Sequence, residues 1–177
     1  MKPRGAFSLI ELLAVIAIIG LLAALSVVAM NGIRAGRDLE AAASTTLGQI
    51  SLARQNALTK ATRTRWALIS APDDRNNDPA AFRKMRLEIF DPARRVWEPL
   101  GRTVVFPVGV VADPSRSTLL TNVASGATNT VTFFGNGRAA QDPAAIHSLT
   151  LFNSINTNNF ITIQFDPVSG RSRSFQP

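Results

Sequence analysis

The first third of the chain changes from continuously apolar to amphipathic. From Leu12 to Met30 no charged residue occurs, and only Gly20 and Ser26 interrupt the apolar side chains. At 1.5 Å per residue this stretch makes a helix of about 28 Å, enough for the hydrocarbon core of a bilayer. Apolar residues then recur at helical spacing, at Leu39, Ala43, Leu47, Ile50, Ala57 and Leu58. We therefore predict one long helix, transmembrane over residues 7–30 and amphipathic over residues 31–62.

Beyond residue 62 the period changes from helix to strand. Met85, Leu87 and Ile89 alternate with Arg86 and Glu88, as in a half-buried strand. The expected strands are 66–69, 85–90, 102–106, 130–134, 148–152 and 160–165. Turn signals rich in Asp, Pro and Gly separate them. The predicted fold class is α+β: a long helix followed, over residues 63–177, by one domain built on an antiparallel β-sheet or small β-sandwich.

One carboxylate, Glu11, lies near the start of the apolar segment. An ionisable group inside a membrane span costs about 2.5–3.5 kcal/mol even on lenient scales, so we expect it to have a partner. Lys2 and Arg4 precede the span, which predicts a cytoplasmic N-terminus and an exported remainder. A secretory signal would carry its small-residue cleavage site after the apolar region. Here the small residues come first, so we expect a short leader to be removed and the helix to be kept.

This N-terminal segment resembles the class III signal of type IV pilins and type II secretion pseudopilins. The string Phe7-Ser-Leu-Ile-Glu-Leu-Leu13 carries the resemblance. Prepilin peptidases cut after a small residue, usually Gly, and before a Phe or Met four positions ahead of a Glu. The resemblance therefore implies a leader of residues 1–6, cleavage between Ala6 and Phe7, and N-methylation of Phe7. Ala6 stands where Gly is usual; a cut after Gly5 is the alternative, and it breaks this spacing.

The same resemblance implies a role and partners for the mature helix. In a filament, Glu11 would neutralise the terminal amine of a neighbouring subunit, because a buried charge is tolerated when it is paired. The implied partners are a prepilin peptidase, other pilins or pseudopilins, and an inner-membrane assembly platform with its ATPase. The implied location is a single pass through the bacterial inner membrane, with a periplasmic β domain, followed by extraction into a filament. The alternatives are a plain signal anchor, in which Glu11 snorkels to the interface, and an anchored binding module outside any filament.

Two further landmarks are similar to the GspH/FimT branch of minor pseudopilins and minor pilins. Leu52, Ala53, Arg54 and Ala57 approximate its Leu-x-x-Ala-Arg-x-x-Ala pattern before the first strand. The final segments Phe134-Gly-Asn-Gly-Arg138 and Phe165-Asp-Pro-Val-Ser-Gly-Arg171 resemble its last strands. The chain has no cysteine, whereas many major pilins close a C-terminal loop with a disulfide. The resemblance covers about residues 5–61 and 130–175, implies a structural filament subunit, and leaves residues 72–128 unmatched.

Basic residues near the C-terminus suggest a second function. The net charge is +7, and loss of the two leader cations leaves about +5. FimT-like minor pilins of naturally transformable bacteria bind DNA through a Gly-Arg-x-Arg motif that resembles Gly170-Arg-Ser-Arg173. The resemblance implies that Arg171 and Arg173, with Arg138, contact DNA phosphates. The alternative is that these arginines discourage aggregation of an edge strand.

The residues do not predict an enzyme. His147 is the only histidine, and cysteine is absent, which excludes a metal site of the His and Cys type and leaves any nucleophilic triad resting on one residue. The acidic loop containing Asp73, Asp74 and Asp78 offers oxygens suited to calcium but lacks the Gly and the distal Glu of a dedicated calcium loop. We expect no cofactor and no metal.

Overall fold

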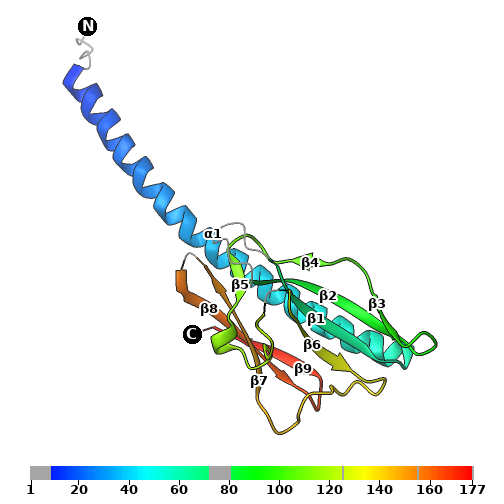
Figure 1. The fold of residues 1–177 in the computed structure, drawn as a ribbon. Coiled ribbons are helices and arrows are strands. Elements are labelled where there is room, and N and C mark those ends of the chain that lie inside the picture. Colours follow the sequence, from blue (N-terminus) through cyan, green and yellow to red (C-terminus); the bar gives the residue numbers. More distant parts are fainter. Residues whose placement is uncertain (1–8, 72–80, 125, 155, 177) are drawn as a thin grey trace. The chain divides into compact units, whose positions relative to one another are not determined.

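The computed structural model describes residues 9–71, 81–124, 126–154 and 156–176, without the side chains of residues 25–33 and 156. It begins with one uninterrupted helix, α1, Leu9–Lys60 (Figure 1). The chain divides into two compact units, Met1–Gly36 and Arg37–Pro177, so α1 contributes to both.

The N-terminal unit exposes apolar side chains. Every side chain over residues 9–24 is exposed, among them Leu9 at 82% and Leu21 at 66%. Within the described residues, no helix is both long and apolar enough to cross a membrane. The predicted transmembrane segment, residues 7–30, extends beyond the described side chains at both ends.

The second unit contains an antiparallel sheet, which confirms the predicted α+β class. In the described part of the chain the sheet has 9 strands, in the order β6-β1-β2-β5-β7-β8-β9, with β3 and β4 paired to β2. A short 3₁₀ helix, η1 (Pro114–Arg116), follows β5. The strands are β1 Thr64–Ser70, β2 Phe82–Asp91, β3 Val96–Pro99, β4 Val104–Val105, β5 Val110–Ala112, β6 Thr128–Phe133, β7 His147–Asn153, β8 Asn156–Asp166 and β9 Arg171–Phe175.

The C-terminal half of α1 packs on the sheet through small side chains. Its buried residues recur at helical spacing, and four of them are alanines, which lets the strands approach closely. They are Leu39, Ala42, Ala43, Thr46, Ile50, Ala53 and Ala57. The hydroxyl of Thr64, at the start of β1, also donates to the carbonyl of Ala53. Most of the apolar face expected from the sequence is therefore buried, although Leu58 is 45% exposed.

The sheet curls so that strands from its two ends meet. Phe133 of β6 and Phe165 of β8 make an edge-to-face contact, with ring centroids 5.6 Å apart. The backbone N–H of Ala139, after β6, donates to the carbonyl of Pro167, after β8, over 2.9 Å. Figure 1 shows β6 and β9 converging beneath α1. This convergence brings two turns that are far apart in sequence, at residues 134–138 and 166–170, against the same helix.

Candidate functional site

The sites expected from the sequence fall in three places. Ala6 and Phe7 lie outside the described residues, as does the acidic loop with Asp73. Glu11 is exposed in the first turn of α1. The three arginines assigned to DNA lie in the second unit.

Arg138 belongs to a tight turn that follows β6. The N–H of Gly137 donates to the carbonyl of Phe134 over 2.8 Å, and the N–H of Arg138 donates to the Asn136 side chain over 3.1 Å. Gly137 has φ +78°, a backbone conformation that favours glycine. The side chain of Arg138 is exposed.

Arg171 and Arg173 follow a second tight turn, between β8 and β9. The Asp166 carboxylate accepts hydrogen bonds from the Ser169 hydroxyl at 2.5 Å and from the Val168 N–H at 2.9 Å. These bonds, that of Ser169 first, hold the pKa of Asp166 below its ordinary value of 3.8. Gly170 closes the turn with φ +65°, and its N–H donates to the Asp166 carbonyl over 2.8 Å.

Arg54 of α1 joins the two turns. Its Nε donates to the carbonyl oxygen of Gly137 over 3.2 Å. A Cβ atom on Gly170 would lie 2.6 Å from Cδ of Arg54 and 2.8 Å from the Gly137 carbonyl oxygen. Glycine at position 170 therefore serves two needs, the positive φ and the space occupied by Arg54. The helix landmark and the two Gly-Arg turns thus form a single junction.

A groove of about 390 Å³ lies beside this junction, between α1 and β9. We call it the arginine groove, because Arg54, Arg171 and Arg173 all line it. Its full lining is Ser51, Arg54, Gln55, Leu58, Gly170, Arg171, Ser172 and Arg173.

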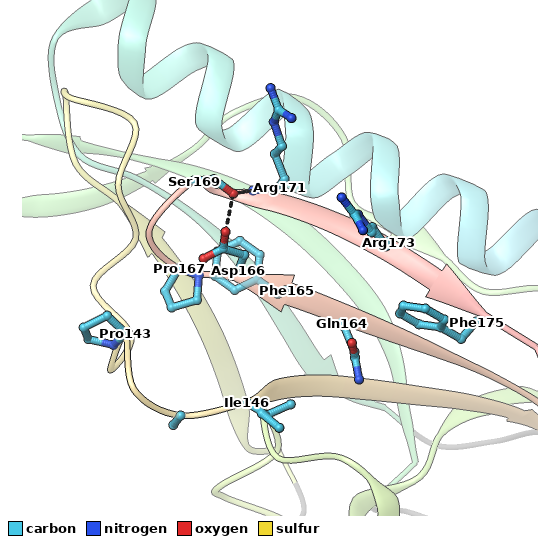
Figure 2. A pocket seen from close by; sticks show the side chains of 11 residues that line it. Pro143, Ile146, Gln164, Phe165, Asp166, Pro167, Ser169, Arg171, Arg173 and Phe175 are labelled. Atoms are coloured by element: carbon cyan, nitrogen blue, oxygen red, sulfur yellow. Dashed lines mark hydrogen bonds between the residues drawn. The ribbon is translucent and has the colours of Figure 1, made fainter.

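Arg171 and Arg173 also border a second groove, of about 590 Å³, which Figure 2 shows from close by. Its lining mixes polar side chains with apolar ones, including Ile146, which is 73% exposed, and Phe175. It also contains the ionised Asp166, directly opposite Arg171 in the strand register. Within the described residues neither Arg171 nor Arg173 forms an ion pair.

Comparisons with known proteins find matches to the N-terminal segment and to the fold. Residues 1–27 match the family described as the prokaryotic N-terminal methylation motif. The chain therefore carries this motif at its N-terminus, and its fold is pilin-like. No curated protein sequence matches the chain.

The solved structures of two minor pilin-type proteins resemble the fold of this chain over most of its length. The type IV minor pilin FimU of Pseudomonas aeruginosa has a TM-score of 0.51 and 13% identity, covering 80% of this chain and 89% of its own. The minor pseudopilin EpsH from the Type 2 Secretion System of Vibrio cholerae has a TM-score of 0.52 and 10% identity, covering 79% and 98%. At such identities the likeness concerns the fold alone.

The structure groups the predicted arginines differently from the sequence. Arg171 and Arg173 share a groove, but Arg138 is not among the residues that line it. Arg54, treated in the sequence only as a helix landmark, takes its place beside them. His147 lies at the start of β7 with Nε2 2.8 Å from the Asp142 carbonyl oxygen, a structural contact. Among the described residues no group of His, Cys, Asp or Glu could hold a metal ion.

The junction predicts a position-dependent cost for alanine at glycine. Gly126 also has a positive φ, of +76°, but nothing lies within 4 Å of its would-be Cβ. Gly126→Ala should destabilise the protein by about 1–2 kcal/mol, through the backbone alone. Gly170→Ala should cost about 1–3 kcal/mol more, because its methyl group overlaps Arg54 and the Gly137 carbonyl. Urea unfolding of the two variants measures the difference; equal losses would mean that the junction yields without cost.

Proposed function

We propose that this protein is a minor subunit of a pilin-type filament, of the GspH/FimT branch, processed by a prepilin peptidase. The observation that carries the proposal is the combination, in one chain, of the N-terminal methylation motif and the pilin-like fold. The Arg54 junction adds support, because it gives a physical reason for three landmarks by which the sequence resembles that branch.

The exposed N-terminal part of α1 fits a subunit that is incomplete alone. Its apolar residues, from Leu9 to Leu22, are exposed on all sides of the helix. A helix that is apolar all round is normally covered by a membrane or by other helices. We propose that the inner membrane covers this helix first, while the β domain lies in the periplasm. The helices of other subunits then cover it in a filament assembled by an inner-membrane platform.

The proposal makes Phe7 the first residue of the mature protein. Cleavage between Ala6 and Phe7 should leave an N-terminal peptide that begins with methylated Phe7. Mass spectrometry of the membrane-extracted protein from cells with a prepilin peptidase checks this, and cells lacking the peptidase are the control. An intact leader in both strains would contradict the proposal, whereas a peptide that begins at Ala6 would move the cleavage to Gly5.

Glu11 is proposed to pair with the terminal amine of a neighbouring subunit, which neutralises two charges inside an apolar bundle. Glu11→Ala should leave membrane insertion unchanged and strongly reduce incorporation into filaments. Glu40→Ala, which removes an exposed carboxylate from the same helix, is the matched control. Quantitative immunoblotting of sheared filaments against membranes measures both. Normal incorporation of Glu11→Ala would exclude the pairing.

A second candidate function, DNA binding, is favoured by the arginine groove. Arg171 and Arg173 are exposed, lie outside every described ion pair and share the groove with Arg54. Cations outside ion pairs are available to phosphates, and contacts of this kind need no base recognition. This candidate would place the filament in DNA uptake, whereas a subunit that does not bind DNA fits secretion or pilus assembly.

Salt dependence tests the second candidate. The full chain in detergent should bind a DNA duplex with an affinity that falls steeply as salt rises. Arg171→Ala/Arg173→Ala should weaken binding and lower the slope of log K against log salt by about 1.8, at about 0.9 for each lost phosphate contact. Arg95→Ala/Arg102→Ala removes the same charge from other exposed positions and should change little. Absence of binding at low salt would leave the filament role alone.

A further inference from the structure

We propose that the arginine groove between α1 and β9 is a phosphate-binding site, in which Arg54 acts as a third cationic ligand beside Arg171 and Arg173. The site binds a phosphate group and the polar atoms next to it in the ligand. The phosphate belongs either to a nucleic-acid backbone or to a small polyphosphate. The inference deepens the second candidate function, and it rests on that function only for the identity of the molecule that carries the phosphate.

The composition of the groove fits an anion. Among the described residues that line it there are three arginines and no carboxylate. The hydroxyl residues Ser51 and Ser172 and the amide residue Gln55 complete a polar lining. Guanidinium groups match phosphate oxygens with paired N–H donors, and hydroxyl and amide groups add neutral donors. An anion would also relieve the mutual repulsion of three cations.

The second groove, of about 590 Å³, does not share this chemistry. It contains the Asp166 carboxylate and apolar side chains, Ile146 and Phe175 among them. Because hydrogen bonds from Ser169 and Val168 lower the pKa of Asp166, that carboxylate stays ionised at neutral pH and repels phosphate. Of the two grooves that Arg171 and Arg173 border, the phosphate therefore belongs in the one that contains Arg54.

Arg54 is held in place before any ligand arrives. Its Nε is committed to the Gly137 carbonyl, and the absence of a side chain at Gly170 lets its Cδ lie against the turn. The terminal nitrogens of the guanidinium group remain as further donors. A cation fixed in this way loses less freedom on binding than a free surface arginine does, which favours affinity.

The decisive variant adds a negative charge to the groove without changing its shape. Gln55→Glu is isosteric and exposed on α1, so it should fold normally. Gln49→Glu makes the same change on the same helix outside the lining of the groove. Binding of pyrophosphate and of a labelled single-stranded oligonucleotide is measured on the full chain in detergent. Gln55→Glu should weaken both by about threefold or more, through pairing with the arginines and repulsion of phosphate, and Gln49→Glu should not.

Arg54→Lys and Arg54→Gln then test the third ligand. Arg54→Gln should lower oligonucleotide affinity by about tenfold and the salt slope by about 0.7. Arg54→Lys retains the charge, so it should keep most of the salt slope of the unaltered protein, although it loses the planar guanidinium group and its paired N–H donors. Thermal unfolding of each variant separates loss of the junction from loss of the ligand.

The outcomes distinguish this inference from DNA binding itself. Pyrophosphate binding that responds to Gln55→Glu supports the phosphate site even if no oligonucleotide binds, in which case DNA binding fails alone. Oligonucleotide binding that requires Arg171 and Arg173 but ignores Gln55→Glu and Arg54→Gln overturns the groove and leaves DNA binding standing. If neither probe binds, both proposals are wrong.

Discussion

The hydrogen bond from Arg54 to the Gly137 carbonyl is the constraint on which the rest of this arrangement depends. It joins the helix, the turn after β6 and, through the close approach at Gly170, the turn between β8 and β9. The Ala139 to Pro167 hydrogen bond holds the two turns to each other. Because the arginine occupies space that any side chain at Gly170 would fill, the junction fixes where β9 begins relative to α1. The position of Arg171 and Arg173 follows from it.

One helix serves two purposes in this chain. Its described N-terminal residues are exposed and apolar, so they need a cover supplied from outside the subunit. Its C-terminal half buries alanines against the sheet and points Ser51, Arg54 and Gln55 toward the edge strand. The proposed role as a filament subunit would use both parts, one surface that other helices can cover and one folded domain whose exposed edge can carry a specific contact. Both parts are explained by the size and charge of their side chains, without any catalytic residue.

The sequence predicted the class of the fold better than it predicted the site. Strong periodicity revealed the helix and the longer strands, and the fold class is confirmed. β3 and β5 were missed because four and three residues are too few to show alternation. β9 was expected only from the family resemblance and as an edge strand, because Arg-Ser-Arg-Ser lacks the β-branched and aromatic residues typical of strands. Arg138 was grouped with Arg171 and Arg173 because each follows a glycine turn, whereas the residue that joins them in space is Arg54. The sequence shows the two turn glycines, Gly137 and Gly170, and the helix landmark with Arg54. Only the curl of the sheet in the structure shows that these three residues are in contact.

A double-mutant cycle between Arg54→Ala and Gly170→Ala tests the junction most directly, with unfolding free energies from urea denaturation of the four proteins. If Arg54 occupies the space beside Gly170, alanine at position 170 should cost less once the arginine is removed. The expected coupling is about 1 kcal/mol or more, within the range of residues in direct contact. If the losses of the two single variants add up to that of the double variant within about 0.5 kcal/mol, as for independent sites, this conclusion is wrong. The position of β9 and of the arginine groove would then not depend on Arg54.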